Sequence, residues 1–189
     1  MTMLSSLELI RRVPLFSMLT DAQAVSVADA VVKRRFKRGE VIVEQGKKTN
    51  ALFILLNGRA RVITSDSRGR EVILATLRPG DHIGEMSLID NEPHSATVRA
   101  EVQTDVLMLG RTEFARCLPE NSSMAYAVMR GLVQRLRQAD RKIESLALMD
   151  VYGRVARALL EFAVEEGDGT LLIRERLSRQ DIAKMVGAS

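Results

Sequence analysis

The chain has 189 residues, of which 46% are hydrophobic and 28% charged, with a formal net charge of +4. This composition is typical of a globular protein with one large domain, or with one domain and a small second one. The single cysteine, Cys117, excludes an internal disulfide and a four-cysteine metal site. The sequence has neither a signal-peptide pattern nor an apolar run of about 20 residues. We therefore expect a cytoplasmic protein without a membrane anchor.

The first part of the chain predicts two helices. Ser6–Arg12 has the composition of a short helix, and Val13-Pro14 ends it because proline disfavours helix in the residue before it. Thr20 with Gln23 three residues later is typical of a capping box at the start of a second helix. The helical spacing predicts three side chains that face inward along it: Val25, Ala28 and Val32.

From Lys33 onward, short runs of β-branched and aliphatic residues are separated by glycines. This pattern predicts an antiparallel sandwich or barrel. The segment Ser67-Arg68-Gly69-Arg70 has the composition of a hairpin tip. The basic run 33–38 (KRRFKR) could follow a phosphate backbone, but a solvated strand face is the interpretation that we favour.

The stretch Gly80–Arg99 (GDHIGEMSLIDNEPHSATVR) lies among these strands. Gly84 permits a close backbone approach and is followed at once by the carboxylate of Glu85. Exposed amides in such a loop can form an anion-binding nest, so the stretch predicts a phosphate site. A glycine-rich turn between two strands is the alternative.

A second helical region begins at Thr112 and is interrupted by Pro119. In the long helix that follows, apolar residues recur with alternating spacings of four and three, which is the heptad seam of a coiled coil. We therefore predict a parallel two-helix dimer, with an ordinary core helix as the alternative. The predicted interface comprises Met129, Leu132, Leu136, Ala139, Ile143 and Leu146, and Ala125 extends the same seam.

Asp150-Val151-Tyr152-Gly153 is interpreted as a hinge into another folded part. An amphipathic helix is predicted up to Ala163, followed by a turn at 165–169 and one strand at Leu171–Ile173. Ser178 with Asp181 at the third helical position resembles a capping box. The small Ala183 followed by Gly187 is the shape of the first half of a helix-turn-helix motif.

Taken in this order, the motifs resemble those of the cyclic AMP receptor protein and fumarate–nitrate regulator family of bacterial transcription factors. The resemblance rests on Val13-Pro14-Leu15-Phe16, Phe53-Ile54…Gly58, Gly80-Asp81…Gly84-Glu85-Met86…Ser95-Ala96, Asp150-Val151…Gly153-Arg154 and Ser178–Ala183. It implies an α+β fold in which a cyclic-nucleotide-binding-like antiparallel β-roll, a jelly roll with flanking helices, is followed by a long dimerisation helix and a winged helix-turn-helix. The implied boundaries are 1–120, 121–149 and 150–189.

The resemblance also implies effector-binding positions: Gly84, Glu85, Met86, His94, Ser95, Ala96, Ala139 and Asp140. Two positions depart from the members that bind cyclic AMP, where an arginine stands at His94 and a Thr-Ser pair at 139–140. A neutral histidine lacks the permanent charge and planar donors that suit a phosphate. The effector is left open as cyclic AMP, cyclic di-GMP or none. The single cysteine excludes the family's iron–sulfur cluster, and His82 and His94 are more typical of loop or core residues than of haem ligands.

The function implied is a dimeric, DNA-binding transcription regulator that also contacts RNA polymerase. Arg179, Gln180 and Ser189 would contact DNA phosphates, and the recognition helix is expected to begin where this chain ends. The alternative is a cyclic-nucleotide-binding regulatory module of a kinase or channel, in which 150–189 would have no purpose. An enzyme is disfavoured because no nucleophile–base set is evident.

Overall fold

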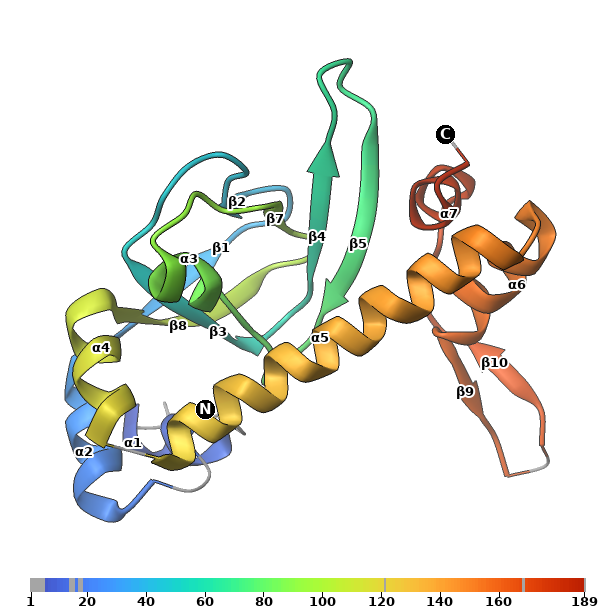
Figure 1. The fold of residues 1–189 in the computed structure, drawn as a ribbon. Coiled ribbons are helices and arrows are strands. Elements are labelled where there is room, and N and C mark those ends of the chain that lie inside the picture. The colour runs from blue at the N-terminus through green and yellow to red at the C-terminus, as the bar shows by residue number, and fades with distance from the viewer. Residues whose placement is uncertain (1–5, 14–15, 17–18, 121, 168, 189) are drawn as a thin grey trace. The chain divides into compact units, whose positions relative to one another are not determined.

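The computed structural model describes residues 6–13, 16, 19–120, 122–167 and 169–188, which form two compact units. Unit 1 comprises Met1–Thr64 with Ala75–Val133, and unit 2 comprises Ser65–Leu74 with Gln134–Ser189. Figure 1 shows the helices and strands of both units.

Unit 1 is built on an antiparallel β-roll. Over the described ranges, one four-stranded sheet has the order β1-β8-β3-β6 and the other β2-β7-β4-β5. The strands are β1 (Val31–Phe36), β2 (Val41–Val43), β3 (Ala51–Asn57), β4 (Ala60–Ser65), β5 (Glu71–Leu77), β6 (His82–Ile83), β7 (Thr97–Ala100) and β8 (Thr104–Gly110). The predicted antiparallel β-roll is therefore confirmed, and so is the hairpin tip at 67–70, where Asp66 N donates to Arg70 O at 3.1 Å.

Strand β3 separates the two hydrophobic cores of unit 1. Its sequence ALFILL is continuously apolar because both of its faces are buried. Leu52 and Ile54 point to a core shared with helices, whereas Phe53 and Leu55 point to the core between the two sheets. Since alternate strand residues face opposite sides, this one strand holds both cores in register.

Helices α1 (Ser6–Arg12), α2 (Asp21–Ala30) and α4 (Arg111–Glu120) contribute to the first core, and Figure 1 shows them gathered at one end of the roll. The Thr20–Gln23 capping box is confirmed, because both reciprocal bonds are present. The inward position of Ala28 is also confirmed. The expectation for Val25 and Val32 is wrong: they are 46% and 63% exposed. Helix α2 ends at Ala30, so Val32 lies on the open face of β1 and does not share the helical stripe.

Helix α4 continues through Pro119 to Glu120, so the expected interruption at Pro119 itself is wrong. Helix α5 (Ser122–Leu148) is 27 residues long. Val128 is buried in the first core and Leu132 packs partly against it. Met129, Val133, Leu136 and Ile143 are instead 50–64% exposed. No helix in the described part of the chain is long and apolar enough to traverse a membrane.

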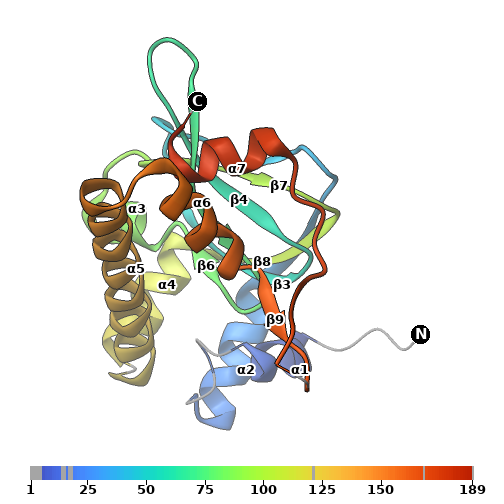
Figure 2. The ribbon, with the colours of Figure 1, turned by 90° about the vertical axis from the view of Figure 1, so that its right-hand side faces the viewer.

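Unit 2 combines the tip of the β4–β5 hairpin with the end of α5 and the C-terminal elements. These are α6 (Val151–Leu160), a hairpin of β9 (Ala163–Glu165) and β10 (Leu171–Ile173), and α7 (Arg179–Val186). Lys142 Nζ donates to Ile73 O at 2.7 Å, and Lys184 Nζ lies 2.7 Å from Glu71 Oε2. Figure 2 shows α6 and α7 next to each other, as their contacts require.

The capping box predicted at Ser178 is confirmed, because both of its reciprocal bonds with Asp181 are present. Asp150, which the sequence suggested as a hinge, is found to cap α6 by accepting a hydrogen bond from Gly153 N at 2.8 Å. The strand at Leu171–Ile173 is confirmed as well. The placement of Ala163 in a helix is wrong, because it begins β9 and pairs with Ile173. The apolar residues at 162–164 fit both a helical and a strand periodicity, and pairing with β10 makes this segment a strand.

Candidate functional site

The first half of the site is the short segment that joins β6 to helix α3 (Glu85–Asp90). Gly84 precedes the helix with φ +93°, and a Cβ placed on it would lie 2.6 Å from the carbonyl oxygen of Ala51. A side chain at position 84 would therefore collide with β3 as well as strain the backbone. The glycine is required because the helix starts directly against the sheet.

Helix α3 presents two different kinds of side chain. Glu85 is completely buried, at 0% exposure, and Leu88 belongs to the first core. Met86 and Ile89 are 48% and 54% exposed. Burying a carboxyl group is costly unless polar partners hold it, so the position of Glu85 is tightly set by its surroundings.

The second half of the site is the loop from Asn91 to Ala96, which leads into β7. It is fastened to the loop between β2 and β3: His94 N donates to Lys47 O and Gly46 N donates to His94 O, both at 2.9 Å. The ring also takes part, with 2.7 Å between His94 Nε2 and Thr49 Oγ1. Ser95, in contrast, is exposed, and Ala96 is buried.

The two halves are joined by short-range bonds. Ser87 Oγ donates to Glu92 O at 2.6 Å, and Glu92 N donates to Asp90 Oδ1 at 2.9 Å. Asn91 ends the helix in the left-handed region with φ 60°. Six of the predicted effector positions, 84–86 and 94–96, thus lie at the two ends of one segment that has internal bonds.

The charge at this segment differs from that of an arginine-bearing loop. Burial lowers the pKa of His94 below its ordinary value of about 6.5. The ring is therefore neutral near pH 7, and its Nε2 is engaged with Thr49. Ser95 is left as the exposed polar side chain between His94 and Ala96.

The other predicted positions lie in unit 2 or on α5. Ala139 and Asp140 are exposed on the part of α5 that belongs to unit 2. Arg179 and Gln180 are exposed in the first turn of α7, directly after the cap at Ser178. Ser189 lies outside the described residues.

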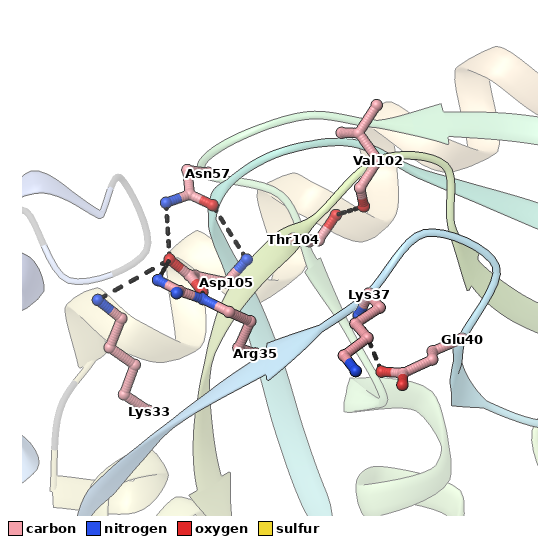
Figure 3. A network of polar contacts seen from close by, with 8 residues as sticks. All are labelled: Lys33, Arg35, Lys37, Glu40, Asn57, Val102, Thr104 and Asp105. Carbon is pink, nitrogen blue, oxygen red and sulfur yellow. Dashed lines mark hydrogen bonds and ion pairs between the residues drawn. The ribbon is translucent and has the colours of Figure 1, made fainter.

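The basic run of β1 is organised by a single buried carboxylate, as Figure 3 shows. Asp105 accepts hydrogen bonds from Arg35 Nε at 2.6 Å and from Asn57 Nδ2 at 2.9 Å, and Lys33 Nζ lies 3.9 Å away. The hydrogen bond from Arg35 is the main reason that the pKa of Asp105 is lowered. Two of the cations thus serve an internal ion pair, which agrees with the strand-face interpretation.

Sequence reasoning missed one residue that touches the site. Arg111, at the start of α4, donates to Ser87 O at 3.1 Å and to Asn91 Oδ1 at 3.2 Å. In the sequence Arg111 is only a charged residue directly after an apolar strand. This local pattern does not predict that Arg111 lies close to Ser87 and Asn91. A search of the described residues for metal-binding groups of three or more His, Cys, Asp or Glu side chains finds none.

The fold of unit 1 is that of a cyclic-nucleotide-binding β-roll. Residues 33–121 match the cyclic nucleotide-binding domain. The chain is 32% identical over 166 residues to the cAMP-activated global transcriptional regulator Vfr of Pseudomonas aeruginosa, covering 83% of this chain and 76% of Vfr. The chain belongs to the cyclic AMP receptor protein and fumarate–nitrate regulator family.

Two further relatives agree with this assignment. The cAMP-activated global transcriptional regulator CRP of Salmonella typhimurium is 29% identical over 161 residues, covering 82% of this chain and 75% of the relative. The structure of CLP, a c-di-GMP responsive global regulator of Xanthomonas campestris, superimposes with a TM-score of 0.77 at 23% identity. It covers 90% of this chain and 86% of CLP, and at this identity it supports the fold alone.

Proposed function

We propose that the protein is a homodimeric, DNA-binding transcription regulator of the cytoplasm whose β-roll binds a cyclic nucleotide. The observation that carries the proposal is the joining, in one chain, of the β-roll segment 84–96 to a helix with an exposed apolar stripe and to the capped helix α7. The names of its relatives add weight, because Vfr and the Salmonella protein are cAMP-activated regulators.

The effector is proposed to bind along 84–86 and 94–96. Gly84 lets the backbone approach closely, Glu85 is fully buried, and Ser95 offers an exposed hydroxyl beside the neutral His94. A phosphate bound here would meet hydroxyl and amide donors in place of a guanidinium. Since a charge-assisted hydrogen bond contributes about 1.5–3 kcal/mol, we expect an affinity for cyclic AMP roughly ten- to a hundredfold weaker than an arginine at position 94 would give.

Calorimetric titration with cyclic AMP and with cyclic di-GMP tests the effector. We expect micromolar or weaker binding of at least one of them, and His94→Arg should tighten cyclic AMP binding. Glu85→Gln keeps the shape of the side chain and removes its charge, and it should weaken binding because Glu85 is one of the proposed effector positions. Failure of both nucleotides to bind or to raise the melting temperature at millimolar concentration would refute the effector proposal.

The dimer is proposed to form through the exposed stripe of α5, around Met129, Val133, Leu136 and Ile143. Of the six residues expected from the sequence, Leu132 is already packed partly against the first core. A large apolar side chain that is 63% exposed, such as Leu136, is explained by a partner helix. Leu136→Glu should give monomers in sedimentation velocity, and Gln138→Glu, at an exposed position on the opposite face of α5, should not.

DNA contact is proposed for the start of α7. Arg179 and Gln180 are exposed where the helix N-terminus also presents backbone N–H groups, and such contacts hold phosphates without selecting a sequence. Salt-dependent gel shifts with promoter fragments test this. Arg179→Ala should weaken binding uniformly across sequences and reduce the salt slope by about one. DNA binding that does not depend on salt would contradict this assignment.

Contact with RNA polymerase is proposed from the family alone.

A kinase or channel module is less well supported. Residues 151–186 fold into two capped helices and a hairpin, which a cyclic-nucleotide module alone does not need. Vfr and the Salmonella protein, whose alignments with this chain cover about three quarters of their own length, are transcription regulators by name. Neither name describes an enzyme.

A further inference from the structure

Arg111 connects parts of unit 1 that are far apart in the sequence. Its guanidinium donates to Ser87 O at 3.1 Å, Leu88 O at 3.4 Å and Asn91 Oδ1 at 3.2 Å. It also donates to Asn50 Oδ1 at 3.3 Å, while its backbone N donates to Asn50 O at 2.8 Å. One residue of α4 is therefore bonded both to the end of α3 and to the loop between β2 and β3.

Helix α3 needs such a partner. It has six residues, and helices this short do not persist without tertiary contacts. Its last carbonyl groups have no acceptor role inside the helix and carry the negative end of the helix dipole. A guanidinium bonded to Ser87 O and Leu88 O satisfies these groups with charge-assisted hydrogen bonds, which are the stronger kind.

The second contact of Arg111 reaches the other half of the site. Asn50 ends the 44–50 loop, and the same loop holds His94 through Lys47 O, Gly46 N and the hydroxyl of Thr49. Arg111 thus fixes α3 directly and the loop that fastens His94 at the same time. The distance between Glu85 and Ser95 depends on both attachments.

We infer that Arg111 is the positioning residue of the effector site: it holds the two halves of segment 84–96 in their binding arrangement without touching the ligand itself. The inference rests on the proposed function for its consequence in binding. Its structural part, that Arg111 fixes segment 84–96, is independent of which effector binds.

Hydrogen–deuterium exchange of the ligand-free protein tests the structural part. Peptides covering 85–95 should exchange at least about tenfold faster in Arg111→Met than in the wild type, because the bonds to the carbonyls are lost. Arg111→Lys keeps the charge but not the fork of donors, and should lie between the two. Arg38→Met, at an exposed turn position of the same unit, should match the wild type.

Two exchange results would overturn the inference. One is unchanged exchange of 85–95 in Arg111→Met. The other is acceleration spread equally over β3 and β8, which would mean general loss of stability. If Arg111→Met does not fold, the same comparison between Arg111→Lys and the wild type decides.

The binding part is tested with cyclic AMP and cyclic di-GMP as probes. For whichever binds, Arg111→Met should raise Kd by about tenfold or more while the ligand-free melting temperature changes little, and Arg111→Lys should restore part of the affinity. An unchanged Kd would remove the positioning role. A wild type that binds neither probe would refute the proposed effector, whereas the exchange result would still decide whether Arg111 fixes the segment.

Discussion

In unit 1, Leu52, Ile54, Leu55 and Leu109 are 0% exposed, whereas in unit 2 Leu160, Val164 and Leu171 are more than 50% exposed. Helix α6 has no buried residue among its ten, and the buried apolar side chains in the described part of unit 2 are Ile73, Phe162 and Val186. The β-roll therefore closes its own core, while the second unit leaves apolar surface for something else to cover. We expect most of the folding free energy to reside in unit 1.

Core truncation gives the largest contrast between the units. Leu55→Ala should lower the free energy of unfolding by about 2–5 kcal/mol, because a fully buried side chain leaves a cavity. Leu160→Ala, at 59% exposure, should cost less than about 0.5 kcal/mol. Urea denaturation monitored by circular dichroism measures both. Equal losses would contradict the expectation that most of the folding free energy resides in unit 1.

Gly131 tests how closely the first half of α5 packs on the roll. A Cβ at Gly131 would lie 2.7 Å from Cε1 of His82. Glycine to alanine inside a helix ordinarily stabilises by up to about 1 kcal/mol, but here overpacking should destabilise by about 1–3 kcal/mol. Adding His82→Ala should make Gly131→Ala favourable again in a double-mutant cycle, and additive effects would exclude the contact.

Asp140 tests the open half of α5. Helical spacing places it on the same face as Met129, Val133, Leu136 and Ile143, so a two-fold dimer would bring two carboxylates towards its axis. Asp140→Leu should tighten dimerisation by about tenfold, which corresponds to about 1.4 kcal/mol. Asp140→Asn separates the loss of charge from the gain of apolar contact. Analytical ultracentrifugation measures both, and weaker dimers with leucine would place another face at the interface.

The smallest expected effect is the pH dependence from His94. Its pKa is lower in the folded than in the unfolded state, so the unfolded state binds the proton first. The contribution to stability is fully present above about pH 6.5 and falls as the pH drops below it, by at most about 1.4 kcal/mol per pH unit. His94→Gln should flatten this slope between pH 6.5 and 5, where Asp105 with its lowered pKa is still ionised.

Local sequence features were sufficient for two helix starts. The capping boxes at Thr20 and Ser178 each depend on residues within three positions of each other, and the structure has both. The predicted inward face of α2 is partly wrong, because Val25 is exposed although its spacing matches a buried stripe. Spacing defines that a helix has two faces, but a distant segment determines which one is covered.

The candidate site shows the same division. The resemblance to the family, which local motifs carry, predicts 84–86 and 94–96 as effector positions, and their role in binding stays a prediction. Only the tertiary structure shows the bonds within segment 84–96. It also shows that His94 is neutral and hydrogen-bonded to Thr49, and that Arg111 links the segment to α4. The physical reason is that caps and turns are set by neighbouring residues, whereas burial, charge state and long-range hydrogen bonds depend on atoms that only folding brings together.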